Sequence, residues 1–309
     1  MPSSPSVTTS RPPLDAPAAS RWLAGRVPGA AGGQAWLHGE VARRMESRLQ
    51  WMRQAPAHWT DWWPSLGGWE AAELLQARYP QARILRVETA PGRLATTRQN
   101  LATPRWQFWK SPPQVAEQAP AGQTQMVWSN MLLHAHPDPE ALLRQWHEAL
   151  SVDGFVMFSC LGPDSLQEMR ALYADLGWPA PAHAFTDMHD WGDLLVQAGF
   201  AEPVMDMERI TLTYADADAL LEDLRALGRN LSPDRFPACR GRGWGGRLRA
   251  ALSAPDSALR SQTADRLGLT FEVIYGHALK PAPRARVAQQ TEVPLQDLKA
   301  MLGRRPVRD

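Results

Sequence analysis

The spacing of apolar residues predicts a helix ahead of the first strands. From Trp36 to Gln54, apolar side chains recur at intervals of four, four, four and three residues, which aligns them along one stripe of a helix. These side chains belong to Leu37, Val41, Met45, Leu49 and Met52. We therefore expect an amphipathic helix that packs this stripe against a core.

Three short runs further along have the length and composition of buried strands. They are Arg83–Glu88 (RILRVE), Gln125–Asn130 (QMVWSN) and Gly154–Cys160 (GFVMFSC). Between the second and third runs, Asp138 can cap a helix that begins at Pro139, a position where the missing N–H costs nothing. Single strands that alternate with helices are typical of a parallel sheet covered on both faces.

Two further helices are predicted after the third strand. Asp164 and Gln167 have the spacing of a capping box for the first of them, and Gly177 ends it. Asp187 opens the second helix and Gly199 closes it. The helices thus continue the alternating pattern.

The pattern changes late in the chain. Val204–Tyr214 (VMDMERITLTY) and Leu269–Ala278 (LTFEVIYGHA) are longer than the earlier strands and alternate polar with apolar residues, as antiparallel edge strands do. The fold class that follows is α/β, Rossmann-like, with a doubly wound, mostly parallel sheet of about seven strands and an antiparallel edge.

One main domain accounts for most of the 309 residues. Residues 1–22 are rich in Ser, Pro and Ala and are expected to be a disordered tail. The domain is expected to span residues 36–281, with an Arg- and Gly-rich insertion over 229–266. Residues 282–309 are expected to be a carboxy-terminal tail.

Composition narrows the possible partners. The formal net charge is +1, which argues against wholesale binding of nucleic acid or of a membrane surface. The two cysteines, Cys160 and Cys239, are too few for a disulfide framework and have no metal-ligand spacing, so a reducing cytoplasm is expected. No run reaches the roughly 18 apolar residues of a membrane span.

The beginning of the sheet offers a ligand site in weakened form. In open parallel sheets, ligands bind beyond the carboxyl ends of the strands, with a glycine turn after strand one and an acidic residue after strand two. Here Trp59–Ser65 can be strand one, Gly67 and Gly68 the turn, and Glu88 the ribose-binding acid 20 residues after Gly68. A simple turn and a solvated glutamate are the alternative.

The second half of the chain resembles a known family. Phe158–Arg170 (FSCLGPDSLQEMR), His183–Phe200, Pro203–Gly228 and Leu269–Pro281 are similar to the malonyl-acyl carrier protein O-methyltransferases of biotin synthesis. Ser129–Ser159 is similar to the segment from strand four to strand five of most class I methyltransferases. The resemblance covers about residues 36–281 and is weaker before residue 125.

This resemblance implies S-adenosylmethionine as cofactor and acyl carrier protein as partner. The reaction would be methyl transfer to the free carboxylate of carrier-bound malonyl. Such a reaction needs orientation and exclusion of water. It needs no general base, because the carboxylate is ionised at neutral pH.

The sequence departs from the family in its cofactor loop. The family's first motif is an acidic residue followed by glycines at alternate positions. Matched onto Asp61, it has Trp63 and Ser65 at the first two glycine positions, and only Gly67 is kept. The acidic signature after strand three is also missing near Lys110–Pro113. Either the chain is a divergent enzyme, for this or another small acceptor, or it is a catalytically impaired binding or assembly factor.

Several residues are candidates for the site. His134 lies just past strand four, and Asn130 can contact the methionyl end of the cofactor or cap a turn. Arg209 and Arg170 could neutralise a substrate carboxylate. No metal site is expected, since the acids around His189 suit a helix first turn better than a ligand set.

The Arg-rich insertion is the candidate docking surface for an acidic carrier protein. Its candidate residues are Arg235, Arg240, Arg242, Arg247 and Arg249. A solvated loop is the alternative interpretation of this segment.

Overall fold

The computed structural model describes residues 12–25, 36–102, 113–255, 257–260 and 266–283. They contain a seven-stranded sheet with the order β3-β2-β1-β4-β5-β7-β6. The strands are β1 (His58–Trp62), β2 (Arg83–Val87), β3 (Gln114–Ala116), β4 (Thr124–Ser129), β5 (Leu150–Leu161), β6 (Ala201–Tyr214) and β7 (Leu267–Leu279). β1 to β5 pair in parallel, and β7 pairs antiparallel with β5 and β6. The predicted fold class is confirmed.

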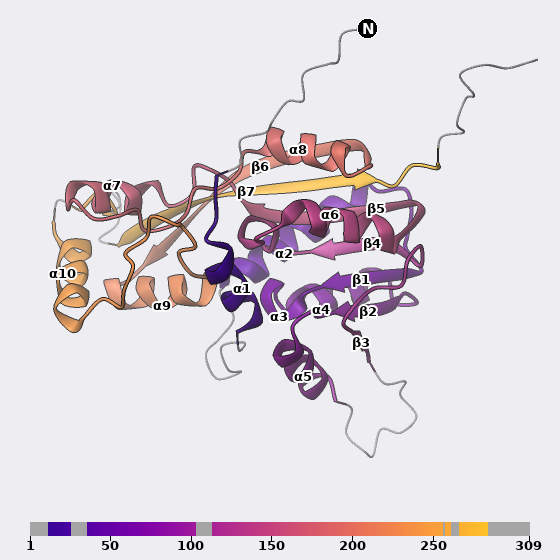
Figure 1. The fold of residues 1–309 in the computed structure, drawn as a ribbon, viewed down its shortest axis with the longest axis horizontal. Coiled ribbons are helices and arrows are strands. Elements are labelled where there is room, and N and C mark those ends of the chain that lie inside the picture. The colour runs from indigo at the N-terminus through magenta and orange to yellow at the C-terminus, as the bar shows by residue number, and fades with distance from the viewer. Residues whose placement is uncertain (1–11, 26–35, 103–112, 256, 261–265, 284–309) are drawn as a thin grey trace, which may run out of the picture.

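Helices cover both faces of this sheet (Figure 1). α2 (Trp36–Arg48) and α4 (Glu70–Arg78) pack into one apolar core, and α6 (Pro139–Ala149) and α8 (Met188–Gln197) pack into the other. Side chains alternate between the two cores along β4, where Met126 and Trp128 face one core and Val127 the other. A strand buried on both faces explains the continuous apolar run in its sequence.

The predicted helix ends are largely confirmed. Asp138 caps α6 by accepting a hydrogen bond from Ala141 N–H at 2.9 Å, and Asp187 caps α8. Gly177 and Gly199 end α7 (Gln167–Asp175) and α8 with positive φ angles of 63° and 97°. The helix predicted from Trp36 is α2, which continues into one short 3-10 turn, η1 (Leu49–Trp51).

Three helices gather at one end of the molecule, beyond the carboxyl ends of the parallel strands (Figure 1). They are α7, α9 (Ala217–Leu227) and α10 (Arg242–Ser253). The 14-residue β6 and the 13-residue β7 run out to them as an antiparallel ribbon. The insertion predicted over 229–266 therefore contains a helix, whose Leu248 and Leu252 are buried.

The structure differs from the tail predicted over residues 1–22. Residues 16–24 form α1 (Ala16–Ala24), capped by Asp15 and buried at Ala19 and Leu23. Asp15 N–H donates to Leu231 O at 2.9 Å, and its carboxylate pairs with Arg235. These partners lie far away in the sequence, so local composition does not reveal them. Residues 1–11 and 284–309 lie outside the described part.

Two local predictions are corrected. β1 ends at Trp62 instead of Ser65. Asp164 and Gln167 form no capping box, because the Asp164 carboxylate accepts a hydrogen bond from the Gln167 side chain at 2.8 Å. The residue that precedes α7 is Leu166, whose backbone is in the left-handed conformation. No helix in the described ranges is long and apolar enough to cross a membrane.

Candidate active site beyond the carboxyl ends of the strands

The connection from β1 to α4 folds into a compact loop instead of an open glycine turn. Trp63 follows β1 with φ 60° and ψ 58°, and the short helix α3 (Pro64–Gly67) comes next. Gly68, with φ 108°, makes the turn into α4. The Trp63 indole is buried in the same core as Leu23 of α1 and lies edge-on to His136, 6.3 Å between ring centroids.

Glu88, the predicted ribose-binding acid, lies directly after β2 and is fully buried. Its Oε1 accepts hydrogen bonds from Ser65 N–H at 2.9 Å and from the Thr97 hydroxyl at 3.1 Å. Its Oε2 is buried with no hydrogen-bond partner among the described residues. Burial raises the pKa of this carboxyl, against the opposing effect of the bonds from Ser65 and Thr97.

Asp61 lies beside Glu88 on the neighbouring strand. It is in register with Arg86 of β2, and its Oδ2 is also buried without a partner in the described structure. Burial raises the pKa of Asp61 to about 7, while Arg86 lowers it and Glu88 raises it further. Two buried carboxyls, each with an oxygen that has no partner among the described residues, therefore lie near the carboxyl ends of β1 and β2.

Arg93 of α5 (Pro91–Asn100) connects this loop to the amino-terminal helix. Its side chain is buried and donates to Leu23 O and to Trp22 O at the end of α1. It also donates to the Ser65 hydroxyl at 3.3 Å. Burial lowers the pKa of Arg93, and the nearby Glu88 opposes this shift. One buried guanidinium thus holds α1 and α3 together.

Asn130 is fully used in contacts within the protein. Its amide nitrogen donates to His38 O at 2.9 Å and to Gly67 O, and its oxygen accepts from the Ser159 hydroxyl at 2.7 Å. Gly67 is required here, since a Cβ at this position would lie 2.7 Å from Asn130 O. The predicted contact of Asn130 with a cofactor stays a prediction and would require these bonds to rearrange.

The acidic half of the predicted cofactor site fits S-adenosylmethionine, and the glycine half does not in this conformation. The unused oxygens of Glu88 and Asp61 could accept hydrogen bonds from ribose hydroxyls. Trp63 and Ser65, however, fill the place of the first two glycines, and Glu88 has no accessible surface.

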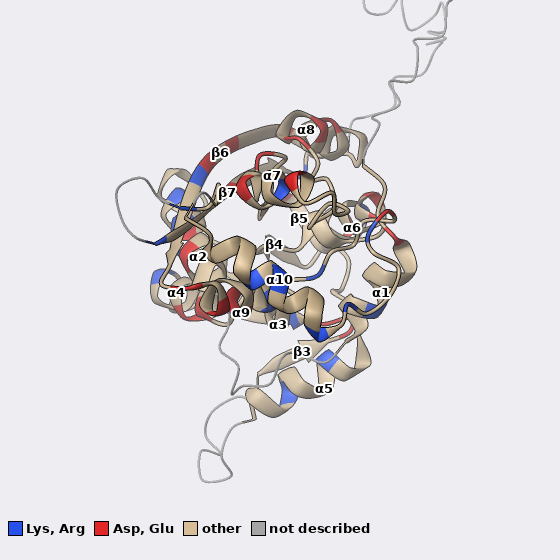
Figure 2. Ribbon diagram, turned by 90° about the vertical axis from the view of Figure 1, so that its left-hand side faces the viewer, with Lys and Arg blue, Asp and Glu red and all other residues tan. Residues whose placement is uncertain are grey.

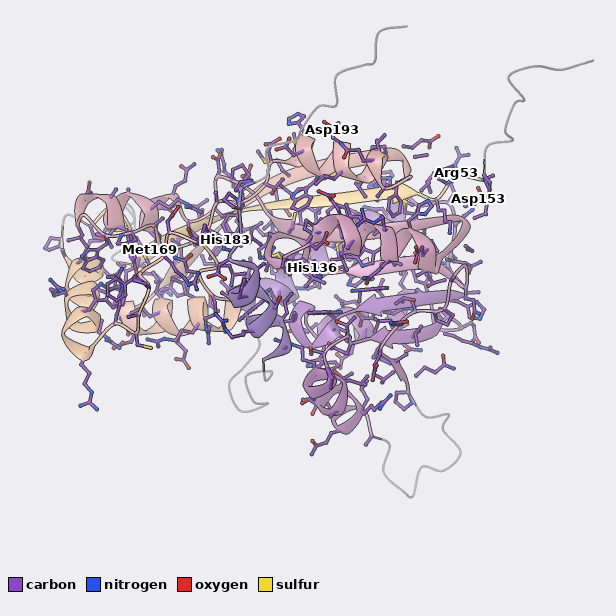
Figure 3. The ribbon with its side chains drawn as sticks, viewed as in Figure 1. Arg53, His136, Asp153, Met169, His183 and Asp193 are labelled. Carbon is purple, nitrogen blue, oxygen red and sulfur yellow. The ribbon has the colours of Figure 1, made fainter. Side chains whose placement is uncertain are left out.

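A cavity of about 730 Å³ lies beyond the carboxyl ends of β4 and β5, among α7, α9 and α10. Figure 3 shows two of its lining residues, Met169 and His183, in the region between α7 and α9. Most of the other lining side chains are apolar, among them Tyr173, Phe185, Leu221, Leu248 and Phe271. His134, the candidate past strand four, also lines this cavity.

His134 and His183 are held side by side in the cavity wall. Their rings stack with centroids 6.5 Å apart, and His183 Nε2 donates to His134 O at 3.1 Å. Burial lowers the pKa of His183 to about 4 and the pKa of His134 well below its usual value. Both rings are therefore neutral at physiological pH.

Comparison with known proteins identifies the family of the chain. Residues 45–202 match the model of a methyltransferase domain. A malonyl-[acyl-carrier protein] O-methyltransferase of Laribacter hongkongensis is 41% identical over 81% of this chain and 84% of its own length. The corresponding protein of Gallionella capsiferriformans is 38% identical over 80% and 85%. The chain belongs to the malonyl-[acyl-carrier protein] O-methyltransferase family.

The solved structures support the fold of this family member. A putative methyltransferase from Bacillus halodurans aligns with a TM-score of 0.51 over 79% of this chain and all of its own, at 12% identity. At that identity the likeness concerns the fold alone. The resemblance to the malonyl-acyl carrier protein O-methyltransferases, which is strongest after residue 125, is thus confirmed for the family and for the fold.

The two arginines predicted to bind a carboxylate are engaged elsewhere. Arg209 of β6 is exposed and forms an ion pair with Asp164. Arg170 of α7 donates to Ala182 O and His183 O, so it fixes the segment before α8. The described residues contain no cluster of three metal-ligating side chains.

Two residues near the site have no signal of their own in the sequence. β3 follows Lys110–Pro113, so the position after strand three belongs to the exposed Glu117, whose neighbour Ala116 accepts from Glu88 N–H at 3.0 Å. A carboxylate therefore does stand at that strand end. His183 comes beside His134 only through the fold, and no spacing in the sequence indicates the pair.

Proposed function

We propose that the chain transfers the methyl group of S-adenosylmethionine to the free carboxylate of malonyl-acyl carrier protein, a step of biotin synthesis. The observation that carries this proposal is the 730 Å³ cavity beyond the strand ends in a member of this family. Its apolar walls suit a tethered acyl chain, and the exposed arginines at its border suit an acidic carrier.

The chemical demands on the protein are modest. S-adenosylmethionine supplies the electrophilic methyl group, and the malonyl carboxylate is already ionised at neutral pH, so no general base is required. The chain has to orient the carboxylate and exclude water. Glu88 and Asp61 would hold the hydroxyl groups of the cofactor, which requires the Trp63–Gly68 loop to move aside.

Methyl transfer is tested directly by mass spectrometry of the carrier. Malonyl-acyl carrier protein incubated with S-adenosylmethionine and the protein should gain the mass of one methylene group. Acetyl-acyl carrier protein, which lacks the free carboxylate, should gain nothing. No gain in either, from folded protein, would overturn the proposal and favour the alternative of a binding or assembly factor, which the relatives described above do not support.

Carrier docking forms the finer part of this proposal. Figure 2 shows basic residues on α10 at the end of the molecule that holds the cavity. Of the candidates, Arg235 pairs with Asp15, Arg249 pairs with Asp218, and the half-buried Arg240 stacks on Trp244, with 4.3 Å to the ring centroid. Arg242 and Arg247 are exposed, and the Arg247 guanidinium makes only a longer contact, 5.9 Å from the Trp178 ring centroid. We assign the carrier contact mainly to these two arginines.

Charge reversal tests this assignment. Arg242→Glu with Arg247→Glu should raise the KM for malonyl-acyl carrier protein about tenfold, because the attraction to the acidic carrier is removed. For the same reason, the KM of the variant should depend less on salt concentration than the KM of the parent. Methylation of malonyl-coenzyme A, which lacks the carrier, should change little. Arg53→Glu, at the opposite end of the molecule in Figure 3, is the matched control. An equal loss with both substrates would contradict the docking role.

The cytoplasmic location expected from the cysteines belongs to this proposal as well.

A further inference from the structure

The polar side chains that line the cavity include a histidine beside the strand ends and several arginines. His134 follows β4 and marks the inner end, next to Leu161 at the end of β5. The exposed Arg225, Arg229 and Arg249 mark the side that opens to solvent. The wall between them is mainly apolar. This order suits a ligand with a polar group at its inner tip, an apolar arm and an anionic outer end.

The tautomer of His134 is fixed by its surroundings. Leu161 N–H donates to His134 Nδ1 at 3.3 Å, so the proton of the neutral ring sits on Nε2. Phe185 lies edge-on to the ring, with 5.6 Å between centroids, and His183 stacks on it. The ring is therefore held in one orientation.

The Nε2–H group of His134 has no hydrogen-bond partner in the described part of the chain, although the ring lines the cavity. His183 is different, because both of its ring nitrogens are used. Its Nε2–H donates to His134 O and its Nδ1 accepts from Leu231 N–H at 3.4 Å. His134 thus offers a donor to a ligand, whereas His183 holds the segment that presents it.

A neutral donor suits the reacting group of this family. A single N–H binds one carboxylate oxygen strongly, since the acceptor is charged, and leaves the other oxygen free to attack. A guanidinium would engage both oxygens. Relying on the proposed function for the identity of the substrate, we infer that His134 Nε2–H binds the malonyl carboxylate and thereby selects malonyl over uncharged acyl groups.

Carrier binding measured without S-adenosylmethionine tests this inference apart from catalysis. The parent should bind malonyl-acyl carrier protein more tightly than acetyl-acyl carrier protein. His134→Phe should weaken malonyl-carrier binding about tenfold and leave acetyl-carrier binding unchanged. His134→Gln, which keeps an N–H donor, should retain part of the preference. Equal weakening of both carriers, or no change in either, would overturn the inference.

The pH profile gives a second readout. The titratable groups that act on His134 are His183 and His38, and burial lowers the pKa of each of these two histidines to about 4. The malonyl preference should therefore be flat from about pH 6 to 8. A preference that grows on acidification through this range would show a charged imidazolium and contradict the inference.

The outcomes separate the two proposals. A protein that prefers malonyl-carrier through His134 and yet transfers no methyl group would defeat the proposed function alone. A protein that methylates malonyl-carrier with unchanged KM after His134→Phe would defeat the role of His134 alone. Circular dichroism of each variant shows that a loss reflects binding and not folding.

Discussion

The carboxylate of Glu88 accepts a hydrogen bond from the backbone N–H of Ser65 at 2.9 Å. The acid at the end of β2 thereby fastens the loop after β1, and both groups are buried. In an open site of this fold, the same carboxylate would face the ribose of a nucleotide-like cofactor. Under the proposed function, the closed loop and the cofactor would compete for this side chain.

Replacement of Glu88 by Gln should weaken binding of S-adenosylhomocysteine while preserving the loop. The amide oxygen can still accept from Ser65, but the charge that strengthens bonds from ribose hydroxyls is gone. We expect a loss of about 1 to 3 kcal/mol in calorimetry. Thr97→Val, which removes only the second bond to Oε1, is the control. Unchanged affinity of Glu88→Gln would remove this residue from the cofactor site.

Asp61 should make stability fall as pH rises through the weakly acidic range. Its pKa is raised from 3.8 to about 7, so the folded protein holds a proton that the unfolded chain releases between these values. The contribution of Asp61 to the free energy of unfolding is therefore complete below about pH 4 and is lost as the pH rises toward 7. The loss amounts to up to about 4 kcal/mol.

Urea unfolding at pH 5 and pH 7.5 measures this effect. Asp61→Asn should remove it, so the difference between parent and variant should grow with pH in favour of the variant. The comparison isolates Asp61 from Glu88, whose pKa is also raised, and from the buried histidines, whose pKa values are lowered. Parallel pH curves would contradict the assignment.

The regular elements could be predicted because their signals are local. Asp138 and Pro139 start α6, and Gly199 ends α8, through caps that need only neighbouring residues. α1 could not be predicted in the same way. Its helix is stabilised by Leu231 and Arg93, more than 60 residues away, and its own composition is that of a tail.

The same distinction between local signals and distant contacts applies to the residues of the candidate site. Glu88 and the glycine turn follow from spacing, whereas the left-handed Trp63 does not, because a bulky residue in this conformation is costly unless tertiary contacts hold it. The pairing of His134 with His183 depends on strand order and on the Arg170 bonds to the intervening segment. Such contacts between distant elements have no periodicity in the sequence.

Arg93 should be a main determinant of α1 docking. Arg93→Met leaves the carbonyls of Trp22 and Leu23 without their buried donor, and removes a positive charge that lowers the pKa of Glu88. We expect a loss of about 3 kcal/mol or more in unfolding free energy. Limited proteolysis with trypsin should then cut at Arg21, in the last turn of α1, faster than in the parent. Arg235→Ala, which breaks the more exposed pair with Asp15, should have a much smaller effect.

The Trp63–Gly68 loop decides between an enzyme and an impaired relative. Trp63→Gly with Ser65→Gly restores glycine at both positions where the cofactor needs close approach of the backbone. Glycine also relieves the positive φ of Trp63, although loss of the buried indole costs about 3 to 5 kcal/mol of stability. Trp62→Phe, a change at the adjacent buried tryptophan, is the control for that loss.

Calorimetry with S-adenosylhomocysteine should show binding to the parent and binding about tenfold tighter to the double variant, because the variant no longer has to displace the indole. Binding that appears only in the double variant would identify the parent as a relic of the enzyme. Binding to neither protein, with both folded by circular dichroism, would rule out the cofactor site at Glu88 and leave the chain as a carrier-binding member of its family.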